Sequence, residues 1–129
     1  MRFDFHFTTR GWQISEVNAE VLGGYVEASG WNKLFAEQLD GYSAPAHPTA
    51  TYANAICKTV PDDGLVALAH ATVYSQDRQV MAHLGRELER CGRKTCLISP
   101  RNLNWSSGQA MLKTGFAIGQ PEMVVRRFA

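Results

Sequence analysis

The sequence predicts an α/β protein with a small, mainly parallel sheet, flanking helices and an N-terminal β-hairpin. Phe3, Phe5 and Phe7 alternate with polar residues, which is the period of a strand with one buried face. The apolar run "LVALAHA" at 65–71 is typical of a strand buried on both faces. A helical pattern and a second apolar run follow it, so residues 65–99 are expected to form a right-handed βαβ unit.

The composition fits a single domain over residues 1–129. The 13 basic and 12 acidic residues are interspersed, which argues against a nucleic-acid partner. No apolar run approaches the roughly 20 residues of a membrane helix, and no signal-peptide pattern opens the chain. These features argue against a membrane partner and predict a soluble, cytoplasmic protein whose three cysteines are small, buried apolar residues.

The N-terminal half is expected to contain two strands and two helices. A second extended run spans 12–18, and Gly11 is expected to take the left-handed position of a three-residue hairpin loop. The apolar spacing over 31–39 predicts a helix that stops at the glycine that follows. A second helical stripe over 52–60 is expected to end before Pro61, where "PDDG" turns the chain.

The C-terminal half predicts the sheet. Within the βαβ unit, Ser75 is placed to cap a helix that Gly92 ends before a strand at 94–99. The stretch "NLNWSSGQAML" predicts a hairpin that turns at Ser107 and Gly108, and "EMVVRRF" predicts a last strand. The expected class is therefore a small Rossmann-like sheet with a polar-faced hairpin at its N-terminal side.

The hairpin ladder places two carboxylates opposite each other. A three-residue loop pairs Thr8 with Trp12, His6 with Ile14, Asp4 with Glu16 and Arg2 with Asn18. Phe3 and Phe5 then share the other face with Val17, whereas a shift by one residue sets Asp4 opposite Ser15 and makes the two arms disagree about the apolar face. Facing carboxylates are destabilising when both are charged, so a compensating interaction is expected.

Three compensations are open. Arg2 can neutralise part of the charge, a carboxyl pKa can rise, or a divalent cation can bind Asp4, Glu16 and the Asn18 amide. These oxygen donors suit Mg²⁺, which shares its shell with substrate phosphates that Arg2 could grip. The alternative is a solvated face with an ordinary surface ion pair worth about 0–1 kcal/mol, and the spacing leaves both interpretations open.

The segments "RFD", "GWQISEVN" and "GGYVEASG" resemble a block of the glutathionylspermidine synthase family and related ATP-grasp proteins of permuted order. That block reads R-x-D, a glutamate a dozen residues later, x-N, and then a second glutamate. The matching residues are Arg2, Asp4, Glu16, Asn18 and Glu27. The segments "LVALAHATVYSQDRQVM" and "CLISPRNLNW" resemble the Rossmann-like pre-ATP-grasp domain of bacterial relatives, so the resemblance covers nearly the whole chain.

The resemblance implies an ATP-dependent carboxylate–amine ligase, in which ATP activates a carboxylate and an amine displaces phosphate. By this resemblance Asp4, Glu16 and Asn18 hold the magnesium of MgATP, and Arg2 contacts the transferred phosphate or the acyl phosphate. Glu27 orients a substrate amine or a metal ligand. The expected cofactors are Mg²⁺ and ATP, and the expected partners are a nucleotide and small carboxylate and amine substrates.

The chain departs from the family pattern in two places. Residues 21–24, "VLGG", lack the hydroxyl groups of the family's Thr-Pro-Thr-Ser-like segment, which argues against glutathione as the substrate. The sequence ends at Ala129, before any section that forms the nucleotide-gripping subdomains. The expectation is therefore a portion of a ligase that is inactive alone and is completed by a missing segment or by a homo-oligomer.

A second candidate site follows the strand at 65–71. His70, Thr72 and Tyr74 lie at its carboxyl end, where open α/β sheets bind ligands, so they are candidate substrate contacts. The alternative is a hydrogen-bonded core histidine and a packed tyrosine, and the three tryptophans are expected to be core or interface residues.

The competing hypothesis is a non-catalytic Rossmann-like module that binds a small anion or a protein partner, because the chain has no P-loop signature. A cysteine or serine nucleophile has little support, because the sequence has no nucleophile elbow. An exposed apolar patch around Trp31, Phe35 or Trp105 would argue against a self-sufficient domain under either hypothesis.

Overall fold

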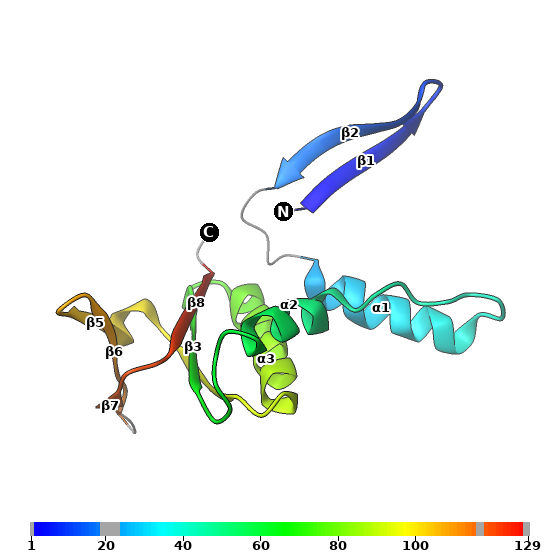
Figure 1. Ribbon diagram of the computed structural model, residues 1–129. Helices are drawn as coiled ribbons and strands as arrows, with labels where there is room; N and C mark the ends of the chain where they lie inside the picture. Colours follow the sequence, from blue (N-terminus) through cyan, green and yellow to red (C-terminus); the bar gives the residue numbers. More distant parts are fainter. Residues whose placement is uncertain (1, 19–23, 116–117, 128–129) are drawn as a thin grey trace.

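The computed structural model describes residues 2–18, 24–115 and 118–127 (Figure 1). It is a mixed α/β fold with a three-stranded parallel sheet and an N-terminal antiparallel hairpin, as the sequence predicts. In chain order the elements are β1 (Arg2–Thr8), β2 (Gly11–Asn18), α1 (Tyr25–Gln38), α2 (Pro48–Cys57), β3 (Leu65–His70), α3 (Ser75–Arg90), β4 (Lys94–Ile98), a 3₁₀ turn (Pro100–Asn102), β5 (Leu103–Ser106), β6 (Gln109–Lys113), β7 (Ile118–Gly119) and β8 (Met123–Arg127).

The parallel sheet has the order β4-β3-β8. Strand β3 is central, and its residues 66–70 are all buried, because neighbouring strands and packed layers surround it. Helix α3 connects β3 to the parallel strand β4, so the predicted βαβ unit is confirmed. The last strand, β8, pairs in parallel with the other side of β3, where Leu68 lies opposite Val125.

The sheet lies between two other layers (Figure 1). One core lies between the sheet and helices α2 and α3, and it includes Val66 and Leu68 from β3. The other core includes Ala67 and Ala69 from β3, together with Leu112 of the antiparallel sheet β5-β6-β7. The alternation of β3 side chains between the two cores follows from the two-residue period of a strand.

The helix ends differ in detail from the sequence predictions. Helix α2 has Pro48 at its first position, which suits proline because that N–H has no helical partner, and it ends at Cys57 rather than next to Pro61. Ser75 is the first residue of α3 and not its cap; Tyr74 occupies the cap position without a side-chain bond, so the cap prediction was wrong. Gly92 follows α3 with φ of 78°, the left-handed conformation expected there.

The second hairpin turns where the sequence predicts. Ser107 and Gly108 have φ values of 50° and 78°, and positive values at both turn residues match the twist of the flanking strands. Strand β7, only two residues long, was not predicted, because two residues carry no periodic signal. The described part of the predicted last strand is β8; Phe128 of that prediction lies outside the described residues.

The three tryptophans are not core residues. Trp12, Trp31 and Trp105 are 67%, 59% and 70% exposed, and Phe35 is 46% exposed. The core interpretation of the tryptophans was therefore wrong, because none of the described elements covers these side chains. The exposed apolar side chains of Trp31 and Phe35, whose ring centroids lie 6.3 Å apart, argue against a self-sufficient domain.

Candidate functional site

The N-terminal hairpin contains the predicted metal ligands, and its register is partly as predicted. Asp4 pairs with Glu16, Phe3 with Val17, and the backbone of Arg2 with that of Asn18. Nearer the turn the prediction was wrong by one residue, because Thr8 pairs with Gly11 rather than Trp12 and His6 with Gln13 rather than Ile14. Gly11 has φ of 89°, so its predicted left-handed conformation is confirmed.

A β-bulge reconciles the two halves of the ladder. The register shifts between Asp4 and Phe5, which leaves Ser15 without an opposite residue, and the Ser15 hydroxyl donates to the Asp4 carbonyl at 3.0 Å. The extra residue puts the paired apolar side chains of both arms on one face. That apolar face comprises Phe3, Phe5, Phe7, Trp12, Ile14 and Val17, which are 44–72% exposed.

The opposite face carries the carboxylates. Asp4 is half-buried and Glu16 is exposed, and their direct pairing puts both side chains on the same side of the hairpin. The side chains of Arg2 and Asn18 lie outside the described part, as do Val21, Leu22 and Gly23 of the "VLGG" segment. Glu27 is exposed in the first turn of α1. The metal and substrate roles of these residues stay predictions.

The other predicted substrate contacts lie at and just after the carboxyl end of β3. His70 is 8% exposed, and its Nδ1 lies 3.0 Å from the carbonyl oxygen of Ala71, as expected for a hydrogen-bonded core histidine. Thr72 and Tyr74 are exposed, so the packed interpretation of Tyr74 was wrong. The exposed pair leaves a substrate contact open at this edge, and that role stays a prediction.

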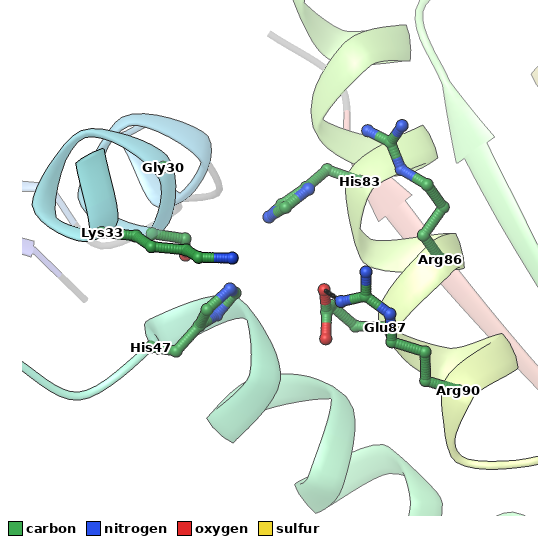
Figure 2. Close-up of a pocket in the computed structure, with 8 residues that line it drawn as sticks. Gly30, Lys33, His47, His83, Arg86, Glu87 and Arg90 are labelled. Atoms are coloured by element: carbon green, nitrogen blue, oxygen red, sulfur yellow. Dashed lines mark hydrogen bonds and ion pairs between the residues drawn. The ribbon is translucent and has the colours of Figure 1, made fainter. Parts of the chain in front are cut away.

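Sequence reasoning missed a pocket of about 300 Å³ among α1, α2 and α3 (Figure 2). Its lining is Ser29, Gly30, Lys33, His47, His83, Arg86, Glu87 and Arg90. Figure 2 shows His47, His83 and Glu87 pointing toward one another, and their nitrogen and oxygen ligand atoms all lie within 4.8 Å of each other. Because His83 and Glu87 are four residues apart on a helix, they share one face, a signal that was readable in the sequence.

Two buried hydroxyl groups hold the walls of the pocket together. Ser29 Oγ of α1 lies 3.0 Å from Thr49 Oγ1 of α2, and Thr49 Oγ1 donates to the Tyr25 carbonyl at 3.3 Å. His47 caps α2, because its Nδ1 accepts the Ala50 N–H at 3.0 Å. The cap bond fixes the imidazole at the N-terminus of α2, where the ring centroid of His47 lies 5.9 Å from that of His83.

The pocket is rich in cations and contains a histidine whose pKa is lowered. Burial lowers the pKa of His83; Glu87 opposes this shift, and Arg86, His47 and Arg90 add to it. His83 Nε2 is buried and has no hydrogen-bond partner among the described residues. Glu87 Oε1 pairs with Arg90, whose side chain is 71% exposed while that of Glu87 is 10% exposed. The pocket therefore offers both ligand atoms for a metal and positive charge for an anion.

The Cys57 thiol is a poor candidate for a nucleophile. Cys57, Cys91 and Cys96 are free and half-buried. Burial, the hydrogen bond with Cys91 and their mutual repulsion raise the pKa of Cys57 to about 11, while Arg93 lowers it by a smaller amount. A thiol with a raised pKa is a poor nucleophile at neutral pH, because little of it is thiolate.

The fold and the two clusters define a mixed α/β chain with a carboxylate-bearing hairpin and a polar pocket between helices. No protein-family model matches the chain, and a comparison with curated proteins finds no match. Among the described residues, none of the helices is both long enough and apolar enough to cross a membrane.

Proposed function

We propose that the chain is a portion of an ATP-dependent carboxylate–amine ligase of the ATP-grasp type, and that the hairpin supplies ligands for MgATP. The body formed by β3, α3, β4 and β8 is, on this proposal, a Rossmann-like pre-ATP-grasp domain of a cytoplasmic enzyme. The observation that carries the proposal is the direct pairing of Asp4 with Glu16.

Electrostatics supports a cation at this pair. Two like charges at cross-strand distance destabilise a ladder by roughly 0.2–1 kcal/mol, a cost that a bound cation offsets. A divalent cation between the carboxylates converts that repulsion into binding energy, and oxygen donors are the ligands that Mg²⁺ prefers. The bulge next to Asp4 is a further support, because bulges are frequent beside active sites, where they re-aim a side chain.

Each proposed site residue has its own role in phosphoryl transfer. Asp4, Glu16 and Asn18 would hold Mg²⁺, which would neutralise the charge of the nucleotide phosphates. Arg2 contacts the transferred phosphate, because its guanidinium fork matches phosphate oxygens. Glu27 orients the amine, while the exposed Thr72 and Tyr74 contact the substrate. Positioning and charge neutralisation account for most of the catalysis of such transfers.

The exposed apolar faces support the view that the chain is completed by other polypeptide. The apolar face of the hairpin and the exposed Trp31, Leu34 and Phe35 of α1 form surfaces of the kind that proteins cover with a further domain or subunit. A two-stranded hairpin alone is at best marginally stable in water, so β1 and β2 in particular need such a cover.

Titration of the chain with Mg²⁺ and with MgATP in a calorimeter tests the proposal. We expect weak binding that Asp4→Ala and Glu16→Ala abolish, because each removes one of the paired carboxylates. Asp40→Ala is the matched control, since it removes an exposed carboxylate outside the hairpin. Binding that is indifferent to both hairpin substitutions rejects the metal assignment.

A second candidate is a non-catalytic module that binds a small anion, and the pocket between the helices favours it. Lys33, Arg86 and Arg90 line that pocket and outnumber its one carboxylate, Glu87. Titration with inorganic phosphate distinguishes the two candidates. The module hypothesis predicts phosphate binding that Lys33→Ala weakens and Asp4→Ala leaves unchanged. The ligase hypothesis predicts instead that Mg²⁺ and MgATP binding depends on Asp4.

A further inference from the structure

We propose that His47, His83 and Glu87 form a binding site for a divalent transition metal of the zinc type. The site is separate from the hairpin and independent of the ligase hypothesis, because its ligands come from the N-cap of α2 and from α3 (Figure 2). It brings His47 next to His83, which lies 36 positions later in the chain. Two of its members, His83 and Glu87, lie on one face of α3.

The donor set selects the metal. Two imidazole nitrogens and one carboxylate oxygen are ligands of Zn²⁺, and this set leaves a fourth coordination position open. Mg²⁺ and Ca²⁺ prefer oxygen donors alone, so they suit the hairpin carboxylates rather than this pocket. In a tetrahedral zinc site the ligand atoms lie about 3.4 Å apart. The observed limit of 4.8 Å therefore requires only small side-chain rotations.

His83 provides the strongest single indication. Its Nε2 is buried without a hydrogen-bond partner among the residues described. A buried polar atom of this kind has lost its hydrogen bonds to water and has gained none in return. A metal ion beside Nε2 supplies the missing partner.

Two existing interactions compete with the metal, and both are weak by comparison. The Nδ1 of His47 accepts the Ala50 N–H, and coordination at either ring nitrogen breaks this cap bond, because Nδ1 then binds the metal or carries the ring proton. A cap bond changes an equilibrium by about tenfold. The Glu87–Arg90 pair involves one carboxylate oxygen and an exposed arginine, so it contributes little. Zinc coordination by three protein ligands changes an equilibrium constant by orders of magnitude more than either interaction does.

The surrounding cations define the fourth ligand. Lys33, Arg86 and Arg90 line the same pocket, and they repel a bare divalent ion. An oxyanion, such as a carboxylate or phosphate oxygen, at the open position relieves this repulsion and binds to metal and cations together. The site is therefore expected to bind metal more tightly when inorganic phosphate is present.

The test uses the full chain after treatment with a chelator. Zn²⁺ is titrated by calorimetry, and Co²⁺ is titrated by its visible absorption, which reports tetrahedral coordination by nitrogen and oxygen. We expect one ion per chain, with an affinity that phosphate raises and that millimolar Mg²⁺ leaves unchanged. His83→Gln and Glu87→Gln keep side-chain volume, and His83→Gln is expected to weaken binding at least about 100-fold, since loss even of an outer-shell partner costs 10–100-fold.

The controls separate this site from other zinc ligands. His6→Gln, in the hairpin, and the double substitution Cys57→Ser/Cys91→Ser are expected to leave the affinity unchanged. Far-UV circular dichroism establishes that each variant is folded. Zinc binding that survives His83→Gln and His47→Gln, or that the cysteine substitutions abolish, overturns the proposal. Phosphate binding with no metal binding also overturns it and assigns the pocket to an anion alone. Asp4→Ala leaves zinc binding intact, so failure here is distinct from failure of the ligase hypothesis.

Discussion

The guanidinium of Arg93 joins the ends of two helices. Its Nε donates to the Val60 carbonyl at 2.8 Å, and its two terminal nitrogens donate to the carbonyls of Cys57 and Cys91 at 2.5 and 2.6 Å. The same group pairs with Asp62 at 2.5 Å, and the side chain is only 9% exposed. Carbonyls at helix C-termini have no helical partners and carry partial negative charge, so one arginine satisfies several of them at once.

Arg93→Ala is expected to lower the free energy of unfolding by about 2–4 kcal/mol, because it leaves these carbonyls unsatisfied. Arg93→Lys recovers only a part of the loss, since an ammonium group cannot reproduce the planar fork. Urea denaturation measures the change. Lys94→Ala is the matched control; its pair with Asp63, at 3.7 Å, is exposed, and its removal is expected to change stability by at most about 0.5 kcal/mol. An equal effect of both substitutions contradicts the role of Arg93.

His83 makes stability depend on pH. Its pKa in the folded chain lies below the ordinary value of 6.5, mainly because of burial. As the pH falls through 6.5, the unfolded chain therefore takes up a proton that the folded chain does not, and the free energy of unfolding decreases. The groups that face His83 across the pocket are His47 and Lys33, with Arg86, Glu87 and Arg90 on its own helix.

His83→Gln removes this proton uptake, so the variant is expected to lose less stability than the parent between neutral and mildly acidic pH. Urea midpoints measured in the presence of a chelator at a series of pH values provide the comparison. His6→Gln, in the exposed hairpin, should leave the slope of the parent unchanged. A parent and a His83→Gln variant with the same pH slope contradict the lowered pKa.

At the scale of the element, the hairpin shows how pattern and register interact. Apolar residues in β2 are spaced two apart between Trp12 and Ile14 and three apart between Ile14 and Val17. A regular strand cannot put all three on one face, and the extra residue Ser15 makes it possible. The apolar face, rather than the turn, therefore sets the pairing of Asp4 with Glu16.

Deletion of Ser15 is expected to remove the bulge and keep every pair. Without the extra residue, Glu16 falls opposite Asp4 in a regular ladder, so the cross-strand contacts of Phe3 with Val17 and Phe5 with Ile14 persist. Nuclear Overhauser effects between α-protons across the strands measure this. Deletion of Gln13 is the contrasting control, because it moves Trp12 to the other face and forces a new register. A register slip after the loss of Ser15 shows that the apolar face does not set the pairing.

The sequence was informative where the determinants are local. The run at 65–71, the amphipathic helix after it and the turn at Ser107 and Gly108 each have their signal within a few residues, and each is confirmed. The register of the hairpin between the bulge and the turn could not be predicted, because a strand with a uniform two-residue period contains no bulge. The pocket depends on how α2 packs against α3, so only the spacing of His83 and Glu87 was visible, and His47 was not.

At the scale of the whole molecule, apolar side chains are divided unequally between interior and surface. The two cores that the structure describes contain residues between Ala53 and Val125, on both faces of the parallel sheet. The apolar side chains of the hairpin and of α1 lie largely outside them. The three layers around β3 therefore provide the stability of the folded chain, whereas the hairpin and α1 present surfaces that another polypeptide can cover.

This division predicts that stability responds to core and hairpin substitutions independently. Leu68→Ala, in a fully buried position of β3, is expected to lower the free energy of unfolding by about 2–5 kcal/mol through lost burial and a cavity. Phe5→Ala, on a side chain 52% exposed, is expected to change it by at most about 0.5 kcal/mol. Urea denaturation followed by far-UV circular dichroism measures both. The double variant should show additive losses, because the two sites share no core. A Phe5→Ala loss comparable to that of Leu68→Ala would mean that the hairpin and the layered body unfold as one cooperative unit, and the apolar face of the hairpin would then be part of the fold rather than a surface for another chain.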